Sequence, residues 1–386
     1  MKVQHLYFDH NATTPVAPEV LEATVSCLGQ VYGNASSIHH FGQVAKQRLE
    51  AARRQLSSLI NANPTDLIFT SGGTEADNMA VLGVARAATG STRHVVVSSI
   101  EHPAVLAACM QLEKEGVALT RLRVGSSGVV QPEDVRDALR PDTVLVTVMH
   151  ANNELGTLQP IAEIARLTRE RRIPLHVDGV QALGKIPVDV EALGADLYSI
   201  SGHKVYAPKG VGALWVRKGT RLAPITFGGH HERDRRPGTE NVPGIVAFGA
   251  AAELVASSLP AETTRLTALR DRLESQILDR IPAAGINGSL WNRVANTSNV
   301  CFDGIDGEAL VIALDLRGCS VSTGAACSSG ALAPSHVLTA IGLPNDRARA
   351  SMRFSLGRSN TVQQVDTLVE ALEASVAHLR RISVHA

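Results

Sequence analysis

Short apolar segments alternate with helical stretches between residues 39 and 216, and this alternation constrains the fold more than any other feature of the chain. Residues 39–60 are predicted to form an amphipathic helix, because their apolar side chains recur at helical spacing. Alternation of this kind predicts an α/β fold in which helices cover a mostly parallel sheet. The strand candidates are residues 67–70, 93–98, 144–149, 174–177, 197–200 and 212–216.

Polar side chains follow these strand candidates within a few residues. They are the segment 71–74, the pair Glu101-His102, the pair Asn152-Asn153, Asp178 and Lys204. In open sheets of this class, ligands bind beyond the carboxyl ends of the strands. One such motif after a strand is expected by chance, but five together predict a ligand site at this edge of the sheet.

Lys204 and Asp178 indicate what the ligand is. A lysine that follows a strand and a small-residue turn can form a Schiff base, and an aspartate that closes the preceding strand can face a pyridinium nitrogen. Pyridoxal phosphate (PLP) needs both groups. Taken separately, each has an ordinary alternative: Asp178 as a surface or capping residue, and Lys204 as a solvated lysine. Gln181 lies where it can donate to the ring oxygen, and the polar neighbours Ser201 and His203 favour a ligand-facing loop.

The segment 70–78 follows a strand and opens a helix. Its glycines allow backbone N–H groups to approach an anion, and a helix N-terminus favours phosphate; the alternative is an ordinary capped turn. The segment matches neither the P-loop pattern nor the dinucleotide-binding pattern. His102 precedes Pro103, which disfavours helical backbone at the histidine and can aim its ring over a flat ligand, although a plain loop histidine is equally consistent.

The five cysteines are odd in number and contain no Cys-x-x-Cys pair, so they predict neither a disulfide framework nor a zinc site, and we expect no metal. Cys27, Cys109 and Cys301 lie in apolar patterns and are predicted to be buried, while the position of Cys319 is ambiguous. Cys327 differs because glycine, alanine and serine surround it, which predicts an exposed and mobile thiol. Thiolates are nucleophilic near neutral pH where the environment lowers their pKa.

The pattern changes near residue 254, which predicts a second and smaller unit. A helix is expected over residues 266–281, strands over 299–302 and 310–316, and a final helix from Thr361, where a capping box begins. Arg353 lies in a strand-like alternation; an arginine there can clamp a carboxylate or form a structural salt bridge. We therefore expect a large domain over residues 16–255, and a small α+β domain from residues 1–15 and 256–386 that carries the Cys327 segment.

Composition excludes several classes of function. Lysine plus arginine equals aspartate plus glutamate at 37 each, and aromatic residues make up 3%, so nothing indicates a nucleic-acid partner. The N-terminus has no signal-peptide pattern, and the longest apolar stretch, near residues 244–252, is shorter than the roughly 20 residues of a membrane helix. Cysteine usage favours the reducing cytoplasm.

Several motifs in order along nearly the whole chain resemble the PLP-dependent cysteine desulfurases of the NifS/IscS group, within the class V aminotransferase family. That resemblance implies the type I PLP-dependent transferase fold, with a mostly parallel seven-stranded sheet in the large domain, and a homodimer. The matching segments are residues 9–15, 33–39, 73–75, 101–106, 151–154, 176–178, 201–204, 238–241 and 326–327.

The resemblance also implies roles for individual residues. Lys204 would carry PLP, Asp178 would pair with the ring nitrogen, and His102 would stack on the ring. Asn152 and Gln181 would bind the side of the ring hydroxyl, and Arg353 and Asn152 the carboxylate of L-cysteine. The phosphate would be held by Gly73, Thr74, Ser201 and His203, with Thr239 reaching it from the partner subunit.

The implied reaction converts L-cysteine to L-alanine, with Lys204 and His102 moving protons and Cys327 accepting the sulfur as a persulfide. The persulfide would pass to an iron–sulfur scaffold or a tRNA-thiolation enzyme. Residues 321–334 resemble the long cysteine loop of group I members. Departures from the expected pattern occur at Ala325, Gly179 and Pro237, outside the proposed chemical roles.

Two other functions remain open from the sequence. One is a different PLP lyase of the same fold, such as a selenocysteine lyase or an aminotransferase-like relative, which would not need a mobile thiol. The other is a non-catalytic subunit that uses the fold as a scaffold for sulfur-handling partners, and the presence of Lys204, Asp178 and His102 weighs against it.

Overall fold

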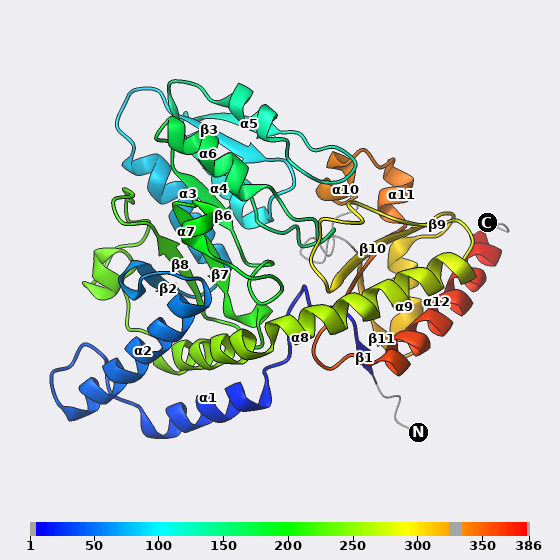
Figure 1. The fold of residues 1–386 in the computed structure, drawn as a ribbon, viewed down its shortest axis with the longest axis horizontal. Coiled ribbons are helices and arrows are strands. Elements are labelled where there is room, and N and C mark those ends of the chain that lie inside the picture. The colour runs from blue at the N-terminus through cyan, green and yellow to red at the C-terminus, as the bar shows by residue number, and fades with distance from the viewer. Residues whose placement is uncertain (1–4, 324–333, 384–386) are drawn as a thin grey trace.

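A computed structural model of the chain describes residues 5–323 and 334–383. Its larger part is built on a seven-stranded sheet with the strand order β2-β8-β7-β6-β5-β3-β4, and its smaller part on a four-stranded sheet with the order β12-β13-β10-β9. The two parts lie side by side, joined by the long helix α8 (Val242–Arg280) (Figure 1).

The seven-stranded sheet confirms the fold class predicted from the sequence. Neighbouring strands are parallel except for β8, which is antiparallel to both β2 and β7. The strands are β2 (Leu67–Thr70), β3 (His94–Ser98), β4 (Ala118–Leu122), β5 (Thr143–Thr147), β6 (Leu175–Asp178), β7 (Leu197–Ser201) and β8 (Gly212–Val216). Strand β4 was not predicted, because it is an edge strand whose residues are mostly only half-buried and lack the continuous apolar run of the others.

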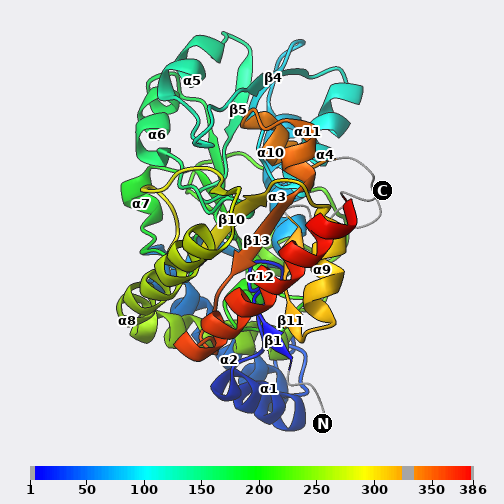
Figure 2. The ribbon, with the colours of Figure 1, turned by 90° about the vertical axis from the view of Figure 1, so that its right-hand side faces the viewer.

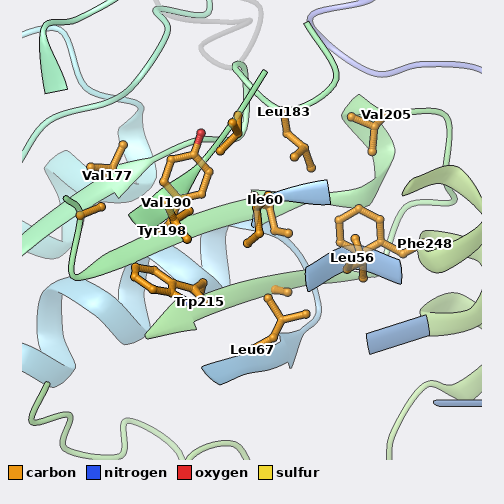
Figure 3. Close-up of a cluster of buried hydrophobic side chains, with 14 of the residues drawn as sticks. Leu56, Ile60, Leu67, Val177, Leu183, Val190, Tyr198, Val205, Trp215 and Phe248 are labelled. Carbon is orange, nitrogen blue, oxygen red and sulfur yellow. The ribbon is translucent and has the colours of Figure 1, made fainter. Parts of the chain in front are cut away.

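Consecutive residues of the central strands enter different hydrophobic clusters. Val95 and Val97 pack on one face of the sheet with α3 and α4, while Val96 belongs to the cluster on the other face. Side chains alternate across a strand, so this division shows that both faces are covered and that the large part has three layers. Figure 3 shows the cluster on the face of the sheet that contains Val96, in which Tyr198 lies close to Trp215, and Phe248 of α8 lies beside Leu56.

Helices of the large part cover the sheet, and α8 packs against both α1 and α2. The helix predicted over residues 39–60 is confirmed as α2 (His40–Leu59). The others in this part are α1 (Pro18–Gln30), α3 (Gly73–Ala87), α4 (Pro103–Lys114), α5 (Pro132–Ala138), α6 (Ile161–Glu170) and α7 (Val190–Leu193), with short 3-10 turns η1 (Pro64–Asp66), η2 (Gly202–Lys204) and η3 (His231–Asp234).

The small part packs its antiparallel sheet against the second half of α8 and the C-terminal helix, which crosses the sheet in Figure 2. A two-stranded parallel sheet pairs the N-terminal strand β1 with β11, which brings the start of the chain to this part. Its elements are β1 (Leu6–Tyr7), β9 (Ala284–Ile286), β10 (Thr297–Phe302), β11 (Cys319–Ser320), β12 (Ser322–Thr323), β13 (Ser351–Ser355), α9 (Gly307–Asp315), α10 (His336–Ala340), α11 (Asn345–Arg349) and α12 (Val362–Ser383).

One predicted strand is wrong. Residues 310–316 lie mostly in helix α9, whose N-cap Asp306 accepts a hydrogen bond from the Ala309 backbone N–H. A short apolar run does not by itself distinguish a strand from a helix, and here the cap decides. The predicted capping residue Thr361 does accept a bond from Gln364 N at 3.3 Å before α12.

The four cysteines in the described residues are all buried and unpaired. This confirms the prediction for Cys27, Cys109 and Cys301, and it places Cys319 in β11. Cys327 lies outside the described residues.

Helix α8 is the one helix of residues 5–323 and 334–383 that is long and apolar enough to cross a membrane by length and composition. Half of its apolar window is buried within the protein, against α1 and α2. Buried core helices meet the same criterion, and the packing identifies α8 as one of them.

Candidate active site

A cavity of about 300 Å³ lies at the carboxyl ends of the sheet strands, closed on one side by the N-terminal segment and the small part. This volume is at the lower end of the range for small-molecule sites, ~300–1,000 Å³. Most of the predicted site residues line it: Gly73, Thr74, His102, Asp178, Gln181, Ser201, His203, Lys204 and Arg353.

Lys204 enters the cavity from η2, directly after β7. Its Nζ donates to two backbone carbonyls, Asn11 O at 2.5 Å and Ala12 O at 2.8 Å. Both acceptors are neutral carbonyl oxygens of the N-terminal segment, and they position the amine within the cavity.

Asp178 ends β6 and is buried. Its Oδ1 accepts a hydrogen bond from Val180 N at 2.9 Å. Burial raises the pKa of Asp178 to about 6, opposed by the Val180 N–H and by the charge of Lys204. Two more buried acids, Asp77 of α3 and Glu101, lie near it, and burial raises the pKa of both well above the ordinary range, with the charge of Asp178 adding to the effect.

His102 is the N-cap of α4, and its Nδ1 accepts from Ala104 N at 3.1 Å. That bond leaves the proton of the neutral ring on Nε2. Burial, with the nearby charges of Lys204 and His336, lowers the pKa of His102 to about 4. The ring is therefore neutral near pH 7 and faces the cavity as an uncharged aromatic surface.

The part of the cavity formed by the N-terminus of α3 and Ser201 is suited to bind an anion. Helix α3 begins at Gly73, and the N-cap residue Gly72 supplies no side chain to satisfy the first N–H groups. A Cβ atom at position 73 would lie 2.8 Å from Val180 Cγ2, so this close approach requires glycine. Ser201 Oγ is buried beside it with no hydrogen-bond partner within the described residues. An orphaned hydroxyl and a helix N-terminus together form a phosphate-binding arrangement.

Of the two residues predicted to bind the ring hydroxyl, Gln181 lines the cavity and Asn152 does not. Gln181 lines the cavity, with its Nε2 donating to Asn11 O at 2.9 Å. The amide of Asn152 is instead engaged with the backbone: its Oδ1 accepts from Glu154 N and Leu155 N, and it is the neighbouring Asn153 that lines the cavity. Roles for Asn152 toward ring and substrate stay predictions.

Arg353 of β13 reaches the cavity from the small part and is almost completely buried. Its Nη2 donates to Asp9 Oδ1 at 2.7 Å and its Nη1 to Asn153 O at 3.1 Å, while Nε has no hydrogen-bond partner in the described chain. Thus part of the guanidinium is tied in place, and the rest is left to bind an incoming carboxylate.

Two predicted residues lie away from the cavity. Thr239 is exposed in the loop before α8 and does not line the cavity, so its predicted contact would need a second subunit. Cys327 belongs to the segment 324–333, outside the described residues.

Several residues of the site were not singled out in the sequence. Glu154 lines the cavity, accepts from Ser335 Oγ at 2.6 Å, and has a pKa that burial raises to about 7. The side chains of Asp77 and His336 also line the cavity, and Asn11 contacts both Lys204 and Gln181. Of these residues, Asn11 could have been found from the sequence, because it lies in the matching segment 9–15. Its position next to Lys204 is set only by the fold.

Comparison with known proteins is consistent with this geometry. Residues 6–368 match the model of the class-V aminotransferase family. The cysteine desulfurase IscS of Dictyoglomus turgidum is 46% identical over 98% of this chain and 96% of its own length. A solved NifS-like protein superposes with a TM-score of 0.92 at 35% identity, covering 97% of this chain and all of that one. SspA in complex with cysteine gives a TM-score of 0.81 at 37% identity, over 91% of this chain and 98% of that structure.

The chain belongs to the class-V aminotransferase family, whose members use PLP. The residues present fit that cofactor. They offer an amine at Lys204, a carboxylate at Asp178, a flat neutral ring at His102, and an orphaned hydroxyl beside a helix N-terminus for the phosphate.

Proposed function

We propose that this protein is a PLP-dependent cysteine desulfurase that converts L-cysteine to L-alanine and transfers the sulfur through Cys327 to an acceptor protein. The observation that carries the proposal is the convergence of Lys204, Asp178 and Arg353 on one cavity from separate parts of the chain. Support comes from the 46% identity to a desulfurase over nearly the full length, and from the related structure that holds cysteine.

The cofactor would be held at both of its ends. Lys204 would bond to its aldehyde carbon and Asp178 would face its ring nitrogen, with His102 on the ring face. Its phosphate would lie at Gly73, Thr74, Ser201 and His203. When bound, PLP supplies an electron sink that stabilises negative charge at the substrate Cα.

Residues of the chain would supply binding and proton transfer. Arg353 binds the substrate carboxylate through the part of its guanidinium that Asp9 and Asn153 leave free, and this orients Cα toward Lys204. Lys204 removes and returns the proton at Cα. His102 carries its proton on Nε2 and accepts at Nδ1 from Ala104, so in this state the ring is a donor rather than a base.

The sulfur step requires a nucleophilic thiolate. Cys327 Sγ attacks the substrate sulfur, an S–S bond forms, and the Cβ–S bond breaks with its electron pair left on the substrate carbon. Protonation of that carbon gives L-alanine. The balance is L-cysteine plus one thiol giving L-alanine plus one persulfide, with no external oxidant. The persulfide then passes to an iron–sulfur scaffold or a tRNA-thiolation enzyme.

The proposal includes a homodimer. Helix α1 and the segment leading into α2 expose large apolar side chains, which monomeric proteins seldom gather on one surface. Thr239, which is exposed and does not line its own cavity, would then reach the phosphate of the partner's site. The exposed apolar residues are Leu21, Val25, Leu28, Tyr32, Ile38 and Phe41.

We also propose the domain division expected from the sequence, with residues 16–255 as the large unit and residues 1–15 and 256–386 as the small one. The small part has its own hydrophobic cluster, which joins Phe8 to residues between Leu266 and Val376. The boundary falls inside α8, so the two units share one helix. Four buried, unpaired cysteines support the cytoplasm as the compartment.

The deciding experiment measures sulfide and alanine released from L-cysteine, with a thiol reductant, by the wild type and Cys327→Ser. Equal amounts of both products from the wild type, with sulfide lost and cofactor absorbance kept in the variant, would support the proposal. Full activity in the variant would favour direct elimination by another PLP lyase. No product from either protein would refute L-cysteine as substrate, and a purified protein without cofactor absorbance would favour a scaffold.

A further inference from the structure

A second lysine lies directly behind the cavity. Lys185 follows Gln181 by four residues, and the residue as a whole is part-buried, with its amine directed inward. Its Nζ donates to Asn11 Oδ1 at 3.0 Å and to Gln181 Oε1. Asn11 and Gln181 are both buried, and Lys185 itself does not line the cavity.

The charged groups around this amine are cations. Lys204 and Arg353 act on it electrostatically, and the charge of Lys185 in turn acts on His10 and His203. No carboxylate within residues 5–323 and 334–383 forms an ion pair with it. Burial and the two neighbouring cations lower the pKa of Lys185 well below its usual range.

The hydrogen bonds fit a neutral amine. A neutral lysine has two N–H groups and one lone pair, and Lys185 donates to two acceptors, Asn11 Oδ1 and Gln181 Oε1. Both acceptors are uncharged amide oxygens, so no partner requires the amine to carry a proton. Lys185 therefore differs in kind from Lys204, which is placed for covalent chemistry.

The contacts of Gln181 with Asn11 and Lys185 together fix which way its amide points. The Asn11 carbonyl oxygen can only accept, so the NH₂ group of Gln181 must face it, and Oε1 is then the atom that accepts from Lys185 Nζ. One N–H of Nε2 then donates to Asn11 O at 2.9 Å. The second N–H belongs to a side chain that lines the cavity, on the side where the ring oxygen of PLP is proposed to lie.

We propose that Lys185 is a positioning residue that holds the Gln181 amide with its N–H toward the ring oxygen of the bound cofactor. This rests on the proposed function, since it deepens the account of the same site. When PLP is bound to Lys204, its ring oxygen and the Lys204 nitrogen would share one proton. A donor to that oxygen stabilises its negative charge once the Lys204 nitrogen loses the proton, and so favours the loss.

The test is a pH titration of the visible absorbance of the holoenzyme. Lys185→Met keeps the length of the side chain but frees the Gln181 amide to turn. The pH midpoint should rise by about one unit, the size expected for the loss of one hydrogen bond to a charged oxygen. Lys218→Met, at an exposed position after β8, is the matched control and should leave the midpoint unchanged.

A double-mutant cycle separates positioning from a direct charge effect. Gln181→Leu should raise the midpoint by itself, and adding Lys185→Met should then change it little. If Lys185→Met raises the midpoint equally in the Gln181→Leu background, Lys185 acts through its own charge and the proposal is overturned. A lowered melting temperature with an unchanged midpoint would also overturn it, because that result describes a purely structural lysine.

Lys185→Gln keeps a neutral donor on a shorter side chain and should give a smaller shift than Lys185→Met. If Lys185→Met does not fold, Lys185→Gln takes its place in the cycle with the same criteria. Failure of the proposed function is distinguishable, because the wild type would then show no cofactor absorbance or no turnover of L-cysteine. A wild type that binds PLP and titrates, with unshifted Lys185 variants, would refute the positioning role alone.

Discussion

The site combines two buried groups of charged residues that are stabilised in different ways. An acidic cluster, Asp77, Glu101 and Asp178, comes from α3 and from the carboxyl ends of β3 and β6. A cationic cluster, Lys185, Lys204 and Arg353, adjoins the N-terminal segment around Asn11. The acids face each other and have raised pKa values, whereas the cations are held by neutral amide oxygens and, at Arg353, by Asp9.

The difference shows how the protein prepares for a ligand that carries both signs of charge. At the acidic cluster, a pyridinium nitrogen would add a positive charge next to Asp178. At the cationic cluster, a substrate carboxylate would add a negative charge next to Arg353. Each group is costly to bury by itself, so ligand binding relieves both costs at once.

The largest effect is expected from Asp178→Asn. The asparagine keeps the shape of the side chain and the oxygen that accepts from Val180 N, but it removes the charge that would keep the ring nitrogen protonated. We expect kcat for desulfuration to fall by ~10²–10⁴, with cofactor absorbance retained through Lys204. Steady-state alanine production checks this. Near-normal kcat would mean that Asp77, which also lines the cavity, serves the ring nitrogen.

A smaller effect is expected from Arg353→Lys on the cationic side. Lysine keeps the positive charge but loses the planar fork, so it cannot hold Asp9, Asn153 O and a substrate carboxylate together. The KM for L-cysteine should rise by about 10- to 100-fold, with a smaller change in kcat. Arg280→Lys, at an exposed ion pair with Glu373, is the control. An unchanged KM would identify Arg353 as a structural partner of Asp9 only.

The smallest effect concerns stability and its pH dependence at Glu101→Gln. Burial raises the pKa of Glu101 above its unfolded value of 4.5, so the unfolded chain loses this proton first and stability falls as pH rises above about 4.5. Glutamine does not ionise, so Glu101→Gln should not lose stability in this way as pH rises. Its free energy of unfolding should match that of the wild type within about 1 kcal/mol at pH 5 and exceed it at pH 8, in denaturant unfolding.

Glu115→Gln is the matched control at an exposed acid, and the pH dependence of its effect on stability should have the opposite sign. Its ion pair with Arg86 and a bond from Gln111 lower the pKa of Glu115 to about 2, so its contribution is present above pH 4.5 and is lost as pH falls toward 2. The pair is largely exposed, so the variant should cost at most about 1 kcal/mol at pH 7. Equal pH profiles for the two variants would contradict the assignment of Glu101 as a buried acid.

Much of the large part was predictable because its signals are local. Five of the six strand candidates, and helix α2, agree with the structure to within one residue at each end, because continuous apolar runs and helical spacing are local features of the sequence. The sixth, residues 144–149, begins one residue after β5 (Thr143–Thr147) begins and ends two residues after β5 ends. Prediction failed where a local run was ambiguous, at residues 310–316, and where an edge strand was half-exposed, at β4.

The sequence by itself determined the α/β architecture, the positions of Lys204 and Asp178 at strand ends, and the burial of most of the cysteines. Tertiary structure alone decided the environment of those residues. Asn11 lies nearly two hundred positions from Lys204, and Lys185 has no local pattern that distinguishes it from a surface lysine. Contacts between distant segments set burial, charge and hydrogen bonding together, and these quantities, rather than residue identity, decide which lysine reacts and which one only positions its neighbour.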